Sequence, residues 1–188
     1  DRMRRTLTRI AILILALGLI GYSGSAVLAQ SPSPTISLSP ISGASGSSIT
    51  ITGSGFAASE TGITVTYDGT LVAWGIFANS QGGWSTTFTI TTSAFGPHTI
   101  NAYGYTTQPG TVLGSLFFVM PNISIGRTSG APGTSVSITG SGFGANETDI
   151  TVTFDGIPVA LAISANPQGS WGATFIIPTS VSGPHTIS

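Results

Sequence analysis

The chain contains one long segment twice. Residues 53–69 read GSGFAASETGITVTYDG, and 87 positions later residues 140–156 read GSGFGANETDITVTFDG, with no insertion or deletion between them. The similarity extends over residues 34–101 and 121–188. A gapless match of this length indicates a duplicated folding unit. We therefore expect two domains of one fold, the first repeat (residues 35–120) and the second repeat (residues 121–188).

The first repeat extends further than its partner. Residues 102–120 have no counterpart before Ser188. We therefore expect the second repeat to be C-terminally incomplete and to lack the equivalent of at least one strand. A missing strand would leave a sheet edge and apolar surface exposed.

Short alternating runs of Ile, Val, Thr and aromatic residues predict an all-β fold. In the run 71–77, for example, the alternation places Val72, Trp74 and Ile76 on one face. Asp68-Gly69 and Asp155-Gly156 separate two such runs, and Asp-Gly favours the tight hairpin turn. About seven strands per repeat favour tandem immunoglobulin-like β-sandwiches. The predicted strands of the first repeat are 35–39, 48–52, 62–67, 71–77, 83–90, 98–104 and 112–119.

Residues 1–29 have the pattern of a secretory signal peptide. Arg4, Arg5 and Arg9 precede an apolar run at 10–20, and Val27 and Ala29 suit a cleavage site after residue 29. The run is shorter than the roughly 20 residues that span a bilayer as a helix. We expect a hydrophobic signal helix, cleavage after residue 29 and a short linker at 30–34. An uncleaved anchor and a twin-arginine signal are the alternatives.

The charge that remains after residue 29 is small. Arg127 is the only Lys or Arg, against five acidic residues, and the chain has no cysteine. Without a basic patch, nucleic acid and anionic lipid are poor partners. We expect membrane contact only through the signal segment or an unseen C-terminal anchor.

One pattern resembles a known family. SLSPISGASGSSITITGSGF (37–56) and SIGRTSGAPGTSVSITGSGF (124–143) are similar to the IPT/TIG family of immunoglobulin-like domains, in which a Pro/Gly-rich turn leads into a strand ending in Gly-x-Gly-Phe. The resemblance implies the repeat domains of bacterial or archaeal stalks, adhesins and accessory modules of secreted enzymes. It provides no catalytic residues to transfer.

Other motifs give only weak indications of a cofactor or metal site. Residues 53–58 fit a loose dinucleotide fingerprint, but a strand follows where a helix N-terminus is needed, so we expect no cofactor. His98 and His185 are single in their repeats, which disfavours a metal site and favours strand-surface histidines. Four carboxylates could contribute to a weak Ca²⁺ site, or be a solvated loop acid and a hairpin aspartate. They are Glu60, Glu147, Asp149 and Asp155.

Aromatic residues provide the candidate ligand platform. Trp84 and Trp171 recur at the repeat distance, which indicates core positions, whereas Trp74 aligns with Leu161. Trp74, Tyr103 and Tyr105 could form an exposed surface for sugar stacking; the alternative is core or junction packing. Asn122 and Asn146 begin N-glycosylation sequons.

Taken together, these features predict a non-enzymatic, secreted or cell-surface repeat protein without cofactor. We expect a spacer, stalk or adhesion module that contacts an extracellular protein or polysaccharide. The alternative is an accessory or carbohydrate-binding module of a larger secreted enzyme, with its catalytic domain beyond residue 188.

Overall fold

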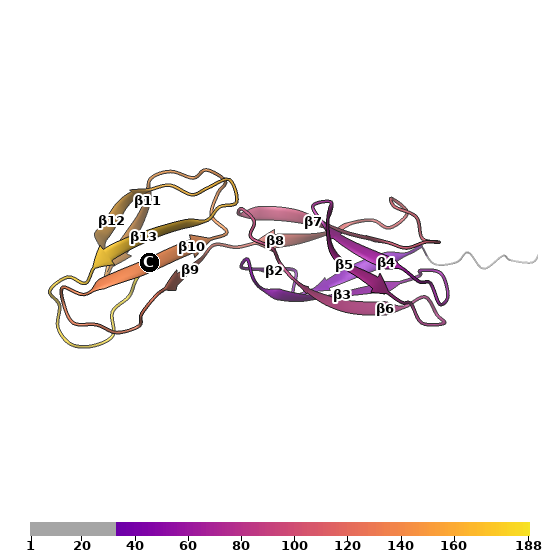
Figure 1. The fold of residues 1–188 in the computed structure, drawn as a ribbon, viewed down its shortest axis with the longest axis horizontal. Helices are drawn as coiled ribbons and strands as arrows, with labels where there is room; N and C mark the ends of the chain where they lie inside the picture. Colours follow the sequence, from indigo (N-terminus) through magenta and orange to yellow (C-terminus); the bar gives the residue numbers. More distant parts are fainter. Residues whose placement is uncertain (1–32) are drawn as a thin grey trace, which may run out of the picture. The chain divides into compact units, whose positions relative to one another are not determined.

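The computed structural model describes residues 33–188, which fold as β-structure (Figure 1). No helix occurs in this range, so none of the described residues form a helix that could cross a membrane. The all-β prediction is confirmed. The expected signal helix and cleavage site at 1–29 lie outside the described residues.

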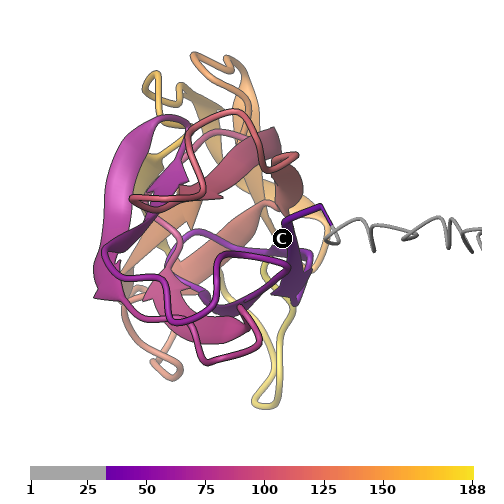
Figure 2. The same ribbon diagram turned by 90° about the vertical axis from the view of Figure 1, so that its right-hand side faces the viewer.

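The strands of the first repeat form two layers (Figures 1 and 2). One sheet has the order β1-β3-β6 and the other has the order β2-β8-β7-β4-β5. Neighbouring strands are antiparallel except β2 and β8, which are parallel. The strands are β1 (Thr35–Ser39), β2 (Ser42–Gly43), β3 (Ser48–Ser54), β4 (Ile63–Tyr67), β5 (Thr70–Ile76), β6 (Trp84–Thr89), β7 (Gly96–Tyr103) and β8 (Ser115–Val119).

The core of the first repeat lies between these sheets. Its most deeply buried side chains come from both layers, since Ile51 belongs to β3 whereas Val65 and Phe117 belong to β4 and β8. Phe56, which follows the Gly-x-Gly corner, is also buried and belongs to this core. Two sheets around one core give the architecture of an immunoglobulin-like sandwich.

The second repeat has the same plan with fewer strands. Its sheets have the orders β13-β10-β9 and β11-β12, and an isolated bridge joins Phe154 to Ile187. A separate core forms around Ile138, Val152 and Phe175. The strands are β9 (Asn122–Ile125), β10 (Ser135–Ser141), β11 (Ile150–Phe154), β12 (Ile157–Ile163) and β13 (Trp171–Ile176).

Hairpins with the predicted Asp-Gly turns join β4 to β5 and β11 to β12. Asp68 and Gly69 have φ angles of 46° and 79°, and Asp155 and Gly156 have 48° and 79°. Positive φ at both positions is what a type I′ turn requires, and its twist suits antiparallel strands. The predicted tight turns at both Asp-Gly pairs are therefore confirmed.

A β-bulge interrupts both hairpins further along. The register of β4 against β5 shifts between Ile63 and Val65, and Gly75 opposite them has a φ of 69°. The extra residue breaks the inward–outward alternation of β5. Trp74 is therefore 71% exposed whereas Val72 and Ile76 are partly buried, so these three side chains do not share one face as the alternation predicts.

The recurring tryptophans pack onto glycine. Trp84 and Trp171 are buried, and a Cβ atom at Gly53 or Gly140 would overlap the respective indole ring. The rings of Phe56 and Phe143 meet these indoles edge-on at centroid distances of 5.3 Å. The core assignment of both tryptophans is confirmed. Gly53 and Gly140 have no side chain, which leaves room for the indole rings.

Candidate functional site

Two of the three residues of the predicted aromatic platform are exposed. Trp74 is 71% exposed and Tyr105 is 78% exposed, while Tyr103 is partly buried in β7. Thr64 pairs with Tyr103 on one side, and the β5 bulge that carries Trp74 lies opposite it on the other. The bulge therefore places Trp74 and Tyr103 on strands that flank the same residue of β4.

Tyr105 belongs to the same end of the sheet. A Cβ atom at Gly62, just before β4, would overlap the Tyr105 ring, so the ring lies against this glycine. The second repeat has Asp149 at the position of Gly62 and Leu161 at the position of Trp74. An exposed aromatic group of this composition is thus a property of the first repeat.

A cleft of about 310 Å³ adjoins Tyr103. Thr66 and Asn101, which pair between β4 and β7, contribute to it from the sheet, and Pro109 contributes from the following loop. Its lining contains no charged side chain. Hydroxyl, amide and aromatic groups of this kind suit a neutral, hydroxyl-rich ligand.

Histidine and aspartate pair in each repeat, which the sequence analysis did not predict. His98 Nδ1–H donates to Asp68 Oδ2 over 2.6 Å, and His185 makes the same bond to Asp155 over 2.6 Å. The other ring nitrogen, Nε2, faces the carbonyl oxygen of Ala94 or Val181 at 2.9 Å. Because each ring nitrogen faces an acceptor, both bonds form only when the ring carries two N–H groups.

These pairs fix the turn of the β4–β5 hairpin to β7, and the turn of the β11–β12 hairpin to residues 185–186. Asp68 Oδ1 accepts from Thr99 N–H, and Asp155 Oδ1 accepts from Thr186 N–H, each over 2.8 Å. The His98 ring also stacks on Tyr67 at a centroid distance of 5.2 Å. The histidines are thus held between hairpin and core, and are more than strand-surface residues.

The pKa values in the second pair shift in opposite directions. The hydrogen bond from His185, together with that from Thr186 N–H, holds the pKa of Asp155 below its usual value. The bond to Asp155, together with that to the Val181 carbonyl, raises the pKa of His185. The pair therefore favours its charged form.

A serine lies near the first pair without forming a catalytic triad. Ser93 Oγ accepts from Tyr67 Oη over 3.0 Å and donates to the carbonyl oxygen of Thr91 over 3.0 Å. His98 Nε2 faces the Ala94 carbonyl. A triad needs the histidine to accept the proton of the serine hydroxyl, and here neither group is free to do so.

Glu60 is buried rather than a solvated loop acid. Its side chain is 4% exposed, and its two oxygens accept from Ala57 N–H, Thr106 N–H, Thr107 N–H and Thr107 Oγ1–H over 2.6–3.0 Å. Burial by itself raises the pKa of this carboxyl, but the bonds from Thr107, Thr106 and Ala57 together hold it below its usual value. Glu60 therefore ties the segment after β7 to the Gly-x-Gly-Phe corner.

The other candidate calcium ligands are separate from one another. Glu147 is exposed and accepts from Gly144 N–H over 2.7 Å, and Asp155 is bonded to His185. Among residues 33–188 no group of three or more acidic, histidine or cysteine side chains could hold a metal ion. The two sequon asparagines, Asn122 and Asn146, are exposed.

Comparison with known proteins bears on the second repeat. Residues 121–188 match the model of the family described as IPT/TIG domain, which confirms the resemblance for this part of the chain. A solved structure of FdeC, described as a broadly conserved Escherichia coli adhesin, is similar at 14% identity and a TM-score of 0.40. The match covers 81% of this chain and 58% of the adhesin chain, and a likeness at this TM-score does not bear on function. Comparison with curated proteins gave no match.

Proposed function

We propose that this chain is a non-catalytic module of a secreted or cell-surface protein, which serves as a spacer and contacts extracellular partners through its sheet surfaces. The proposal rests on the hydrogen bonds of the side chains that could otherwise take part in catalysis. Glu60 and the His98–Asp68 and His185–Asp155 pairs are bonded within the fold. The IPT/TIG match of residues 121–188 supports the same conclusion, because the family consists of immunoglobulin-like modules.

The proposal is tested first by export. The full chain is expressed in a bacterial host, and the cell fraction and N-terminus of the product are determined. We expect an exported product that begins at Gln30, with Arg4→Glu/Arg5→Glu as the matched export-deficient control. Retention of an uncleaved product in the cytoplasm would contradict the extracellular assignment.

A second candidate function, carbohydrate binding, is favoured by the exposure of Trp74 and Tyr105 and by the uncharged cleft that adjoins Tyr103. The partner would be a neutral polysaccharide whose sugar rings stack on the Trp74 indole. This function is compatible with an accessory module of a larger secreted enzyme.

Replacement of Trp74 tests this candidate. On a glycan array we expect binding to a neutral polysaccharide that Trp74→Ala weakens about tenfold or more, because stacked tryptophans carry much of the affinity at such surfaces. Leu113→Ala is the control, since Leu113 is 87% exposed but has no ring. Equal losses in both variants, or no glycan binding by the unmodified chain, would exclude the platform.

A further inference from the structure

The cleft that adjoins Tyr103 contains a buried hydroxyl group without a protein partner. Thr66 of β4 lines this cleft and is 8% exposed, yet its side chain makes no hydrogen bond within residues 33–188. In the same part of the chain, the fully buried side-chain atoms without a partner are the indole nitrogens of Trp84 and Trp171. Thr66 Oγ1 therefore still has contact with solvent, and the cleft is where Thr66 meets it. Buried polar groups normally find a partner, so this hydroxyl group is available to a ligand.

Asn101 provides a second available polar group beside it. Asn101 of β7 pairs directly with Thr66 across the sheet and also lines the cleft. Its side-chain amide makes no hydrogen bond within residues 33–188. A Cβ atom at Gly114 would overlap Asn101 Oδ1, so the amide lies against this glycine. An amide and a hydroxyl together offer donors and acceptors, which is what a pair of sugar hydroxyls needs.

The equivalent side chains of the second repeat bond each other instead. Thr153 and Ser188 lie 87 positions after Thr66 and Asn101. The hydroxyl groups of Thr153 and Ser188 form a hydrogen bond over 2.7 Å. The unpartnered pair is thus a property of the first repeat.

The loop that forms the outer wall of the cleft is held by bonds within the fold. Thr107 N–H and Thr107 Oγ1–H both donate to the buried Glu60, each over 2.6 Å. Thr111 Oγ1–H donates to the Gln108 carbonyl over 2.7 Å, which closes the turn that carries Pro109. A wall fixed in this way does not have to be ordered by the ligand, and this favours binding.

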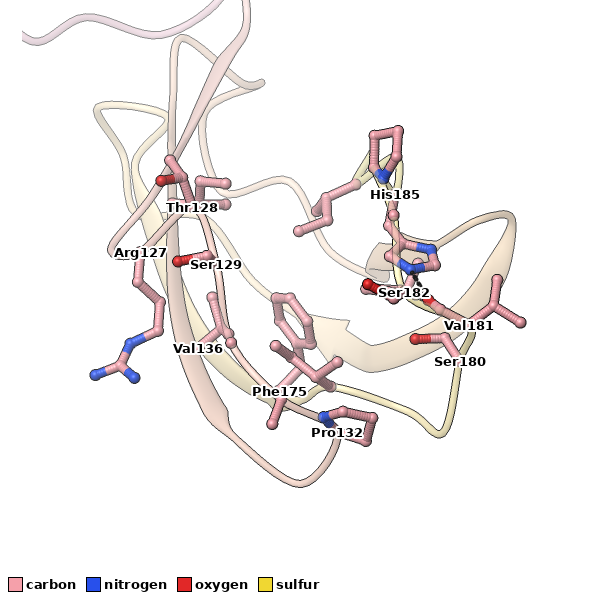
Figure 3. A pocket seen from close by; sticks show the side chains of 18 residues that line it. Arg127, Thr128, Ser129, Pro132, Val136, Phe175, Ser180, Val181, Ser182 and His185 are labelled. Atoms are coloured by element: carbon pink, nitrogen blue, oxygen red, sulfur yellow. Dashed lines mark hydrogen bonds between the residues drawn. The ribbon is translucent and has the colours of Figure 1, made fainter.

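The larger cavity of the second repeat has a different lining. It measures about 600 Å³, and Figure 3 shows Val136 and Phe175 between the segments 127–129 and 180–185. None of the polar residues in its lining is buried. Of these two cavities, the cleft of the first repeat is therefore the one that offers a buried polar group to a ligand.

We propose that this cleft binds one pyranose ring of a neutral polysaccharide, with the Thr66 hydroxyl and the Asn101 amide bonded to its hydroxyl groups. The proposal rests on the carbohydrate-binding function proposed above and assigns the residues that select the sugar. The volume of about 310 Å³ lies at the lower end of the range of ligand pockets, roughly 300–1,000 Å³. Acidic sugars are disfavoured, because no cation in the lining would offset a buried carboxylate.

NMR of the 188-residue chain with cellohexaose, maltohexaose and mannohexaose tests the cleft. At least one of the three should shift the side-chain amide signals of Asn101 saturably. Asn101→Ala should weaken this binding at least about tenfold, and Thr66→Val about three- to tenfold, because hydrogen bonds to the sugar are lost. Thr153→Val is the matched control in the second repeat and should leave the affinity unchanged.

Thermal unfolding separates a binding role of Thr66 from a structural one. Thr66→Val should not lower the Tm, because a methyl group of the same shape replaces a hydroxyl group that has no partner. A lowered Tm would show that the hydroxyl group stabilises the fold, and would overturn the proposal.

The platform and the cleft can fail separately. Binding that Trp74→Ala weakens but Thr66→Val and Asn101→Ala do not would overturn the cleft and leave carbohydrate binding in place. Absence of binding by all three oligosaccharides would overturn the cleft whatever the glycan array shows. Equally tight binding of hexagalacturonic acid would contradict the preference for a neutral sugar.

Discussion

The two repeats share their turns and differ in the contacts that residues 102–120 make, because residues 121–188 contain no counterpart of this segment. Both have the Asp-Gly hairpin, the bulge, the tryptophan on glycine and the His–Asp pair. Yet Glu60 is buried where Glu147 is exposed, and Ile100 has no exposed surface where its counterpart Ile187 is only partly buried. The shared features depend on contacts among segments that both repeats possess. The differing features depend on β8 and on the segment that precedes it.

The largest effect is expected from truncating a buried side chain of β8 in the first repeat. Phe117→Ala should lower the free energy of unfolding of this repeat by about 3–5 kcal/mol, because a fully buried ring leaves a cavity. Phe118→Ala, on the outer face of the same strand, should cost much less. Urea denaturation followed by hydrogen exchange of residues 35–120 measures both. Equal stability of the two variants would contradict the conclusion that the buried side chains of β8 stabilise the first repeat.

The glutamates should show an intermediate effect. Glu60→Gln should lower the free energy of unfolding of the first repeat by about 1–3 kcal/mol, because an amide cannot accept all the bonds of the carboxylate. Glu147→Gln should have little effect, since Glu147 is exposed and bonds only Gly144. Thermal unfolding of each variant provides the comparison.

The Glu60 effect should also depend on pH. Because the pKa of Glu60 is lowered by folding, its contribution is present above the unfolded pKa of about 4.3 and is lost as the pH falls through the lower folded value. The stability difference between the unmodified chain and Glu60→Gln should therefore shrink in acid. A difference that stays constant in acid would contradict the role of the carboxylate.

The smallest effect concerns the His185–Asp155 pair of the second repeat. Because folding raises the pKa of His185, its contribution is complete below about pH 6.5 and is lost as the pH rises through the folded value. Asp155 has a lowered pKa, so its contribution is lost in acid. An NMR titration of His185 should show a raised pKa that returns to the usual value in Asp155→Asn. An unshifted pKa in the unmodified chain would contradict the pairing.

Much of the fold follows from local patterns in the sequence. The Asp-Gly turns, the alternation around Ile49 and Ile51, and the buried Trp84 depend on residues close in the chain or on a period of two, which sequence displays directly. The alternation does not place Trp74 correctly relative to Val72 and Ile76, because the register of β4 against β5 shifts twice within this hairpin. No alternation pattern reveals where a bulge lies.

The site contacts were harder to predict because they join distant residues. Glu60 bonds Thr107, and His98 bonds Asp68, across strands that become neighbours only in the folded sheet. The recurrence of Asp68 and His98 at the same distance in the second repeat was the available signal, since a pair repeated together is a candidate contact.

The bulges also affect how readily the edge strands pair with strands of another molecule. β5 and β12 are edge strands, and both expose apolar side chains, including Leu71 and Leu161. A straight edge with so little charge would invite pairing with a neighbouring chain and growth into aggregates. The bulge twists and interrupts the ladder of backbone groups on that edge. It therefore makes the edges of β5 and β12 poorer templates for such pairing.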